Sequence, residues 1–296
     1  MSPTFFTTED GDIVLRASPG SGPNHDFPVH RLILSLASPV FKDMFSFAQP
    51  SDQSEQLGVP VVDLPDSPEV LDVILRFIYP GVEPPKFTDL TTLSALLSAA
   101  DKYNIASMWP VLREALKTFI PNESFRAYIV ACRFGFLEEA RAAAKASTPS
   151  SIPLQRSHEK EVRDISNVDL YRLVWFVNKR EASGRSRIRY FASFQTCYHN
   201  PCPIEEHWED AVNFYEKLER RLLGAFAEDP CVQYNGLSGV LDEQPDPPPG
   251  CKPEDLGSES VCFLRPSYIR DNLARLAREL GEINDGLLRE AFGKEF

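Results

Sequence analysis

Two different periods of hydrophobic positions occur in the first 120 residues of the chain. Short runs that are rich in β-branched residues, or that alternate between apolar and polar, predict strands at residues 13–15, 27–29 and 59–64. Apolar residues three or four positions apart predict helices that begin near His30, Pro39, Asp66, Leu90 and Met108. A strand hairpin, two helices, a strand and three further helices predict an α+β domain over residues 1–120.

The remainder of the chain, residues 121–296, shows mainly the helical period. Apolar faces recur at residues 125–132, 137–146, 170–177, 208–226 and 269–287. A Ser/Pro-rich break at 147–157 is the best candidate for an internal linker. The proline-rich stretch 242–260 is predicted to be a loop, because proline lacks the amide hydrogen that regular structure needs. The sequence therefore predicts a mostly α-helical extension after the first domain.

The last helical period has the spacing of a heptad seam. Its apolar residues follow one another at intervals of 4, 3, 4, 3 and 4: Ile269, Leu273, Leu276, Leu280, Ile283 and Leu287. The seam lasts under three heptads, and Gly281 and Gly286 weaken the helix. Docking onto the helical extension is therefore favoured over a coiled coil between two chains.

Composition and charge narrow the range of partners. Of 296 residues 43% are hydrophobic, which is enough for a core, and 31 Lys and Arg against 43 Asp and Glu give a net charge of −12. This charge argues against a nucleic-acid partner, because such proteins present basic stripes to the phosphates. No apolar run is long enough to cross a membrane, and the first residues lack the basic and apolar regions of a secretory signal. We therefore expect a soluble protein of the cytoplasm, the nucleus or both, with no membrane partner.

Four short motifs in the first domain keep the order and spacing of a known family. They are Gly11-Asp12-Ile13-Val14-Leu15, Phe27-x-Val29-His30-Arg31-x-Ile33-Leu34, Ser38-Pro39-Val40-Phe41-x-x-Met44-Phe45 and Phe77-Ile78-Tyr79-x-Gly81. Through these motifs residues 11–120 resemble a BTB/POZ domain. The resemblance implies a domain that dimerises and that, in many members, bridges a cullin-based ubiquitin ligase to a substrate. It covers a little over a third of the chain, and no recognisable substrate-binding repeat follows it.

Six residues of this domain form the candidate protein-interaction site: Asp12, His30, Arg31, Phe41, Met44 and Phe45. Asp12 and Arg31 have opposite charges, and their ordinary interpretation is a surface pair worth at most about 1 kcal/mol. The resemblance implies instead that their positions line a charged pocket at the dimer seam. For His30 the favoured interpretation is a buried ring bonded to backbone across the hairpin. The Phe and Met side chains are interpreted as core, with any exposed member forming an association surface.

Cysteine and histidine cluster at one place beyond the first domain. Cys197, His199, Cys202 and His207 are ligand types that suit tetrahedral zinc, but their spacing matches no standard zinc finger. A metal-free turn is favoured, structural zinc is the alternative, and no other cofactor is indicated. A basic run at residues 172–189 precedes the cluster and could meet an acidic partner or the acidic first domain.

No catalytic motif is evident in the sequence. The chain has neither a phosphate-binding glycine loop nor a nucleophile elbow, and adjacent carboxylates such as Glu138 and Glu139 are expected to point apart on a helix. We therefore predict a protein that is not an enzyme. It is expected to be an adaptor that forms a homodimer through its first domain and contacts a further protein, for which the resemblance implies a cullin. Two alternatives stay open: a transcription or chromatin cofactor, and an enzyme with an unrecognised site in the C-terminal part.

Overall fold

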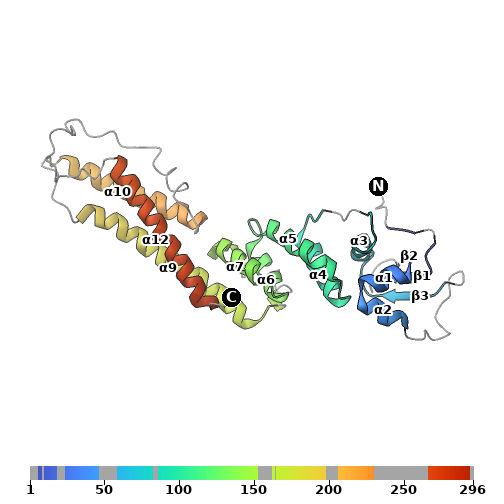
Figure 1. Ribbon diagram of the computed structural model, residues 1–296. Coiled ribbons are helices and arrows are strands. Elements are labelled where there is room, and N and C mark those ends of the chain that lie inside the picture. The colour runs from blue at the N-terminus through green and yellow to red at the C-terminus, as the bar shows by residue number, and fades with distance from the viewer. Residues whose placement is uncertain are drawn as a thin grey trace. The chain divides into compact units, whose positions relative to one another are not determined.

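The computed structural model of the protein describes residues 6–8, 10–18, 24–46, 59–82, 86–152, 162–163, 165–197, 206–229 and 266–293. The chain divides into two compact units, Met1–Phe119 and Ile120–Phe296 (Figure 1). The predicted loop at 242–260 and residues 153–157 of the Ser/Pro-rich break lie outside the described residues. None of the described helices combines the length and the hydropathy that crossing a membrane requires.

The N-terminal unit contains a three-stranded sheet with β1 (Ile13–Ala17) in the middle. On one side β2 (His25–Val29) pairs with β1 in the antiparallel direction, with Ile13 opposite Val29. On the other side β3 (Val61–Leu64) pairs with β1 in the parallel direction. Every second residue of β1 is buried, which is the pattern of a strand with one face on a core.

The other regular elements described in this unit are helices. They are α1 (Arg31–Ala37), α2 (Pro39–Ser46), α3 (Pro68–Ile78), α4 (Leu90–Lys102), the short 3₁₀ helix η1 (Ala106–Met108) and α5 (Trp109–Phe119). Side-chain caps determine where α3 and α4 begin. The Ser67 side chain accepts a hydrogen bond from the Val70 amide, and the Asp89 side chain accepts one from the Thr92 amide. A sheet followed by helices confirms the predicted α+β class.

One buried contact ties the corner between α1 and α2 to the end of α4. The Ser38 hydroxyl donates a hydrogen bond to the Tyr103 carbonyl and accepts one from the Phe41 amide at 3.1 Å. The ring of Phe41 stacks on that of Tyr103, with 4.7 Å between centroids. Because Ser38 and Phe41 are completely buried, this contact fixes the position of α1 relative to the rest of the core.

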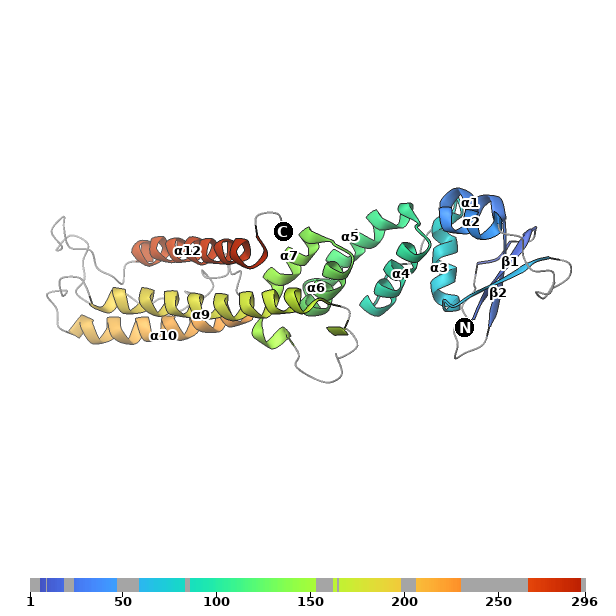
Figure 2. The same cartoon turned by 90° about the horizontal axis from the view of Figure 1, so that it is seen from below.

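Every regular element in the described part of the C-terminal unit is a helix. Its elements are α6 (Ser124–Arg133), α7 (Leu137–Ala146), the 3₁₀ helix η2 (Pro149–Ser151), α9 (Asn167–Cys197), α10 (Glu206–Glu228) and α12 (Pro266–Phe292). Both α10 and α12 run along α9 (Figure 2). Their shared core contains Ile188, Phe191, Tyr215, Leu218, Leu222, Phe226, Ile269, Leu273, Leu276 and Leu280. The predicted docking of the last helix onto the helical extension is therefore confirmed.

A buried arginine joins α9 to the end of α7. Arg180 is 1% exposed, and its guanidinium donates hydrogen bonds to the carbonyls of Lys145, at 2.7 Å, and Ser147. The guanidinium also lies 4.9 Å from the centre of the Phe176 ring. The last carbonyls of a helix have no partner within the helix, so Arg180 supplies the donors that the end of α7 lacks.

Candidate protein-interaction site

Two exposed leucines give α1 an apolar outer side. Leu32 and Leu36 are 69% and 80% exposed, whereas Leu34, between them in the sequence, is completely buried. Residues four apart on a helix lie one above the other, so the two leucines form a continuous strip, here called the α1 strip. Large side chains left this open on a short helix cost solvation free energy that a partner surface would recover.

Asp12 and Arg31 lie at the beginning of α1. The Asp12 carboxylate accepts a hydrogen bond from the backbone amide of Arg31 at 2.8 Å, so a residue before β1 holds the first turn of the helix. Among the described residues no ion pair joins the two side chains, so the expected surface pair is replaced by this backbone contact. The Arg31 Nε atom is buried and has no hydrogen-bond partner within the described part of the chain.

His30 connects β2 to α1 and bonds to the end of α3. Its backbone amide donates to the Tyr79 hydroxyl at 2.8 Å, its ring Nδ1 lies 3.0 Å from the same oxygen, and its Nε2 lies 3.1 Å from Asp10. Burial raises the pKa of Tyr79, so its hydroxyl stays protonated while it accepts the hydrogen bond from the His30 amide. The expectation of a ring bonded to backbone across the hairpin is therefore wrong, because the ring bonds two side chains instead.

The aromatic and methionine residues of α2 differ in burial. Phe41 is completely buried and packs between Phe45 and Tyr103, so it supports the surface from beneath. Met44 and Phe45 are half-buried, which leaves part of each side chain open to a partner. Participation of the six candidate residues in a partner contact stays a prediction.

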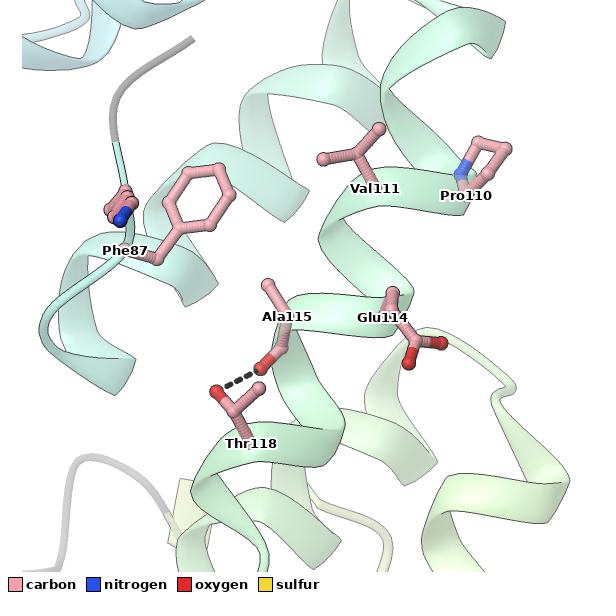
Figure 3. Close-up of a pocket in the computed structure, with 7 residues that line it drawn as sticks. Phe87, Pro110, Val111, Glu114, Ala115 and Thr118 are labelled. Atoms are coloured by element: carbon pink, nitrogen blue, oxygen red, sulfur yellow. Dashed lines mark hydrogen bonds between the residues drawn. The ribbon is translucent and has the colours of Figure 1, made fainter.

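A second open surface lies on α5. A pocket of about 550 Å³ is lined by Lys86, Phe87, Pro110, Val111, Glu114, Ala115 and Thr118. Figure 3 shows the Phe87 ring, from the segment before α4, on one side of the pocket, with Val111 and Ala115 of α5 on the other. The Thr118 hydroxyl donates a hydrogen bond to the Ala115 carbonyl at 2.7 Å, and the lining of the pocket as a whole is mainly apolar. Such a site suits an apolar side chain of another protein.

The basic run on α9 is largely neutralised within its own unit. Arg185 pairs with Glu181 on the same helix, and Arg187 pairs with Glu279 of α12. Arg172 also pairs with Asp169 at 3.3 Å, and Arg189 lies 3.8 Å from Glu219. These pairs engage four of the arginines within the unit, and the contact of the run with an acidic partner or with the acidic first domain stays a prediction.

The candidate zinc ligands cannot be placed together. His199 and Cys202, and the side chains of Cys197 and His207, lie outside the described residues. Within the part of the chain that the structure describes, no group of three or more His, Cys, Asp or Glu residues has the arrangement of a metal site. The zinc alternative stays a prediction.

Cys132 on α6 is expected to be a poor nucleophile. Burial raises the pKa of its thiol to about 12, despite a hydrogen bond with Tyr128 that lowers it. Near neutral pH the reactive thiolate is therefore almost absent. At pH 8 we expect iodoacetamide to alkylate Cys132 roughly a thousandfold more slowly than an ordinary cysteine. Peptide mass spectrometry of the native chain measures this rate. The same chain in urea is the control, and equal rates in both would contradict the expectation.

The three-stranded sheet with its helices, the exposed leucines and the apolar pocket are the features expected of a protein-interaction module. Residues 6–120 match the BTB/POZ domain family, so the N-terminal part of the chain is a BTB/POZ domain, as the motifs indicated. The chain is 33% identical over 92 residues to TD and POZ domain-containing protein 5 of Mus musculus, covering 31% of this chain and 26% of that protein. It is also 33% identical over 92 residues to TD and POZ domain-containing protein 1 of Mus musculus, covering 31% and 24%. This chain thus spans about a quarter of the length of these relatives.

The six candidate residues omit the most exposed apolar side chains among the described residues of the domain. Leu32 and Leu36 belong to a first-helix region with more apolar side chains than a small core readily hides, which already favours symmetric pairing. Periodicity alone did not show that they face away from Leu34. Val111 carried a clearer signal, because it lies between the buried positions Met108 and Leu112 and off their face. An apolar residue on the polar side of an amphipathic helix is a sign of a binding surface.

Proposed function

We propose that this protein is a non-enzymatic adaptor, which pairs with a second copy of itself through the α1 strip and uses the α5 pocket to bind a further protein. The observation that carries the proposal is the exposure of Leu32 and Leu36 on a helix held firmly at its N-terminal end. A two-fold symmetric contact would bring the strip of one chain against the same strip of its partner. The buried Arg31 Nε beside it is a donor for which a partner chain could supply an acceptor.

The test of self-association is a charge placed in the strip. Leu36→Glu is expected to raise the dissociation constant of the dimer by about a hundredfold, because the symmetric contact would bury the new carboxylate twice. Sedimentation velocity of the full chain over a concentration series measures the change. Since Leu36 is 80% exposed, the helical content should be unchanged.

A matched variant separates self-association from a general effect of charge. Val111→Glu adds the same charge at an exposed position of α5, outside the α1 strip, and is expected to leave the dimer intact. A wild-type chain that stays monomeric at tens of micromolar, or a Leu36→Glu chain that dimerises normally, would refute pairing through α1.

For the α5 pocket we propose a cullin-type ligase scaffold as the partner, which would make the chain a substrate adaptor. Support comes from the membership of residues 6–120 in the BTB/POZ family and from the open, mainly apolar lining of the pocket. Titration of the full chain with a purified cullin N-terminal domain, followed by calorimetry, tests this. Binding that Val111→Glu weakens and Leu36→Glu leaves unchanged would support the assignment, and no measurable heat with the wild-type chain would exclude it.

A further inference from the structure

The outer face of α9 in the C-terminal unit is exposed along most of the helix. Val168 and Tyr171 are 57% and 67% exposed, Trp175 is partly exposed, and Lys179, Ala182 and Ser186 are exposed. These residues, here called the α9 outer face, follow one another at intervals of three or four, so they lie on one side of the helix. The opposite side packs on α10 and α12 through Ile188 and Phe191. The face begins with three consecutive apolar or aromatic positions, which is unusual for the solvent side of a helix.

This face carries positive charge without negative charge. Between Val168 and Ser193, every exposed residue of α9 is apolar, neutral polar or cationic. The two carboxylates of the helix, Asp169 and Glu181, are partly buried and bonded to Arg172 and Arg185. Two carboxylates of the neighbouring helices are likewise engaged, Glu279 of α12 with Arg187 and Glu219 of α10 with Arg189. Among the described residues, Lys179 therefore stands beside the aromatic positions with no carboxylate on the face to neutralise it.

We propose that the α9 outer face binds an acidic amphipathic helix of another protein, laid along α9 as an additional helix of the bundle. Apolar side chains of that helix would cover Val168, Tyr171 and Trp175, and its carboxylates would meet Lys179 and, one turn beyond Ser186, Arg189. The residues of the α9 outer face follow one another at intervals of three and four. A helical partner matches this spacing, because side chains on its own surface form ridges with the same intervals. The complementary charge fixes the sign of the partner's polar face.

Nucleic acid is a poorer fit to the same face. A duplex carries one negative charge about every 1.7 Å along its axis and is bound by a series of cations. Most arginines of α9 are bonded to carboxylates of their own unit, which leaves Lys179 and the loosely paired Arg189 on this side. Apolar and aromatic contact, supported by a small number of charges, is the chemistry that the face offers.

The probe is a synthetic helical peptide of about 16 residues, long enough to reach from Val168 to beyond Lys179 at 1.5 Å per residue. It carries leucine on one face and glutamate on the other, and a companion peptide replaces every glutamate by lysine. Fluorescence anisotropy of the labelled peptides is measured with the full chain. The glutamate peptide is expected to bind about tenfold or more tightly than the lysine peptide, and raised salt should weaken it.

Variants locate the binding on the chain. Lys179→Glu and Tyr171→Ser are each expected to weaken the glutamate peptide about tenfold, since one removes the cation and the other the exposed aromatic ring. Lys217→Glu makes the same charge change at an exposed position of α10 and should have little effect. Absence of binding, or equal losses for Lys179→Glu and Lys217→Glu, would overturn the proposal. Displacement of the peptide by a DNA duplex that itself depends on Lys179 would also overturn it. The chain with Leu36→Glu should bind the glutamate peptide as tightly as the wild-type chain does. Loss of peptide binding can therefore be distinguished from loss of the dimer.

Discussion

Replacing Arg180 with methionine is expected to lower the free energy of unfolding of the C-terminal unit by about 3 kcal/mol. Methionine keeps much of the buried volume but removes both hydrogen bonds to the carbonyls of Lys145 and Ser147. These acceptors lie at the end of α7 and would be left without the donors that satisfy them, and an unsatisfied buried acceptor costs more than the bond itself contributes. The contact of the guanidinium with Phe176 would be lost as well.

Urea unfolding of the full chain, followed by circular dichroism, measures the loss. Hydrogen exchange in α7 should show that the last turn of that helix opens first. Arg185→Met on the same helix is the matched control, because Arg185 is paired with Glu181 at the surface and should cost less than about 1 kcal/mol. If both variants lost a similar free energy of unfolding, the buried hydrogen bonds of Arg180 would contribute no more to stability than a surface ion pair does.

The second large effect is expected from Gly11→Ala in the N-terminal unit, at about 3 kcal/mol of destabilisation. A β-carbon at this position would lie 2.6 Å from the Val29 nitrogen and 2.8 Å from the Pro28 carbonyl carbon. Both atoms belong to the backbone of β2, so no side-chain rotation relieves the contact. The hydrogen bond from the Asp12 amide to the Val29 carbonyl, at 3.0 Å, would be displaced together with the Asp12 contact to α1.

Differential scanning calorimetry of the full chain, with hydrogen exchange across β1 and β2, tests this prediction. Gly281→Ala is the control, because a β-carbon there would meet nothing within 4 Å. Alanine at that helical position is expected to stabilise the C-terminal unit, by up to about 1 kcal/mol. A Gly11→Ala chain with unchanged exchange in the two strands would show that β2 can move aside without loss.

Local signals in the sequence were sufficient for the elements and their order. The run Ser67-Pro68-Glu69 predicts a helix start because a capping hydroxyl, a proline and an acid each favour the first turn, and α3 begins at Pro68. The seam from Ile269 to Leu287 predicted docking because an apolar stripe on a helix has to be covered. In both cases the residues that determine the structure lie in the same short segment of the chain as the helix that they predict.

The site was less predictable, because its contacts join residues far apart in the chain. No pattern indicates that the Asp12 carboxylate would bond the backbone of Arg31, or that Tyr79 would meet His30. The pairing of Arg187 with Glu279 also depends on how α12 lies on α9, which sequence spacing does not give. Arg180 did leave a signal, since it occupies the helical phase of the buried residues Leu173, Phe176 and Val177. A cation in that phase indicates a buried hydrogen-bonding role.

The docking of α12 on α9 has a consequence for the order in which the C-terminal unit assembles. The two helices are distant in sequence, since α9 ends at Cys197 and α12 begins at Pro266, so their contact closes a long loop and forms late. Gly281 and Gly286 make α12 a weak helix on its own, so it gains its structure largely on arrival. Until then the side chains of Ile188 and Leu222 that it helps to cover are open to water. We therefore expect newly made chains to expose this apolar surface until the last helix docks, which is the stage at which aggregation competes with folding.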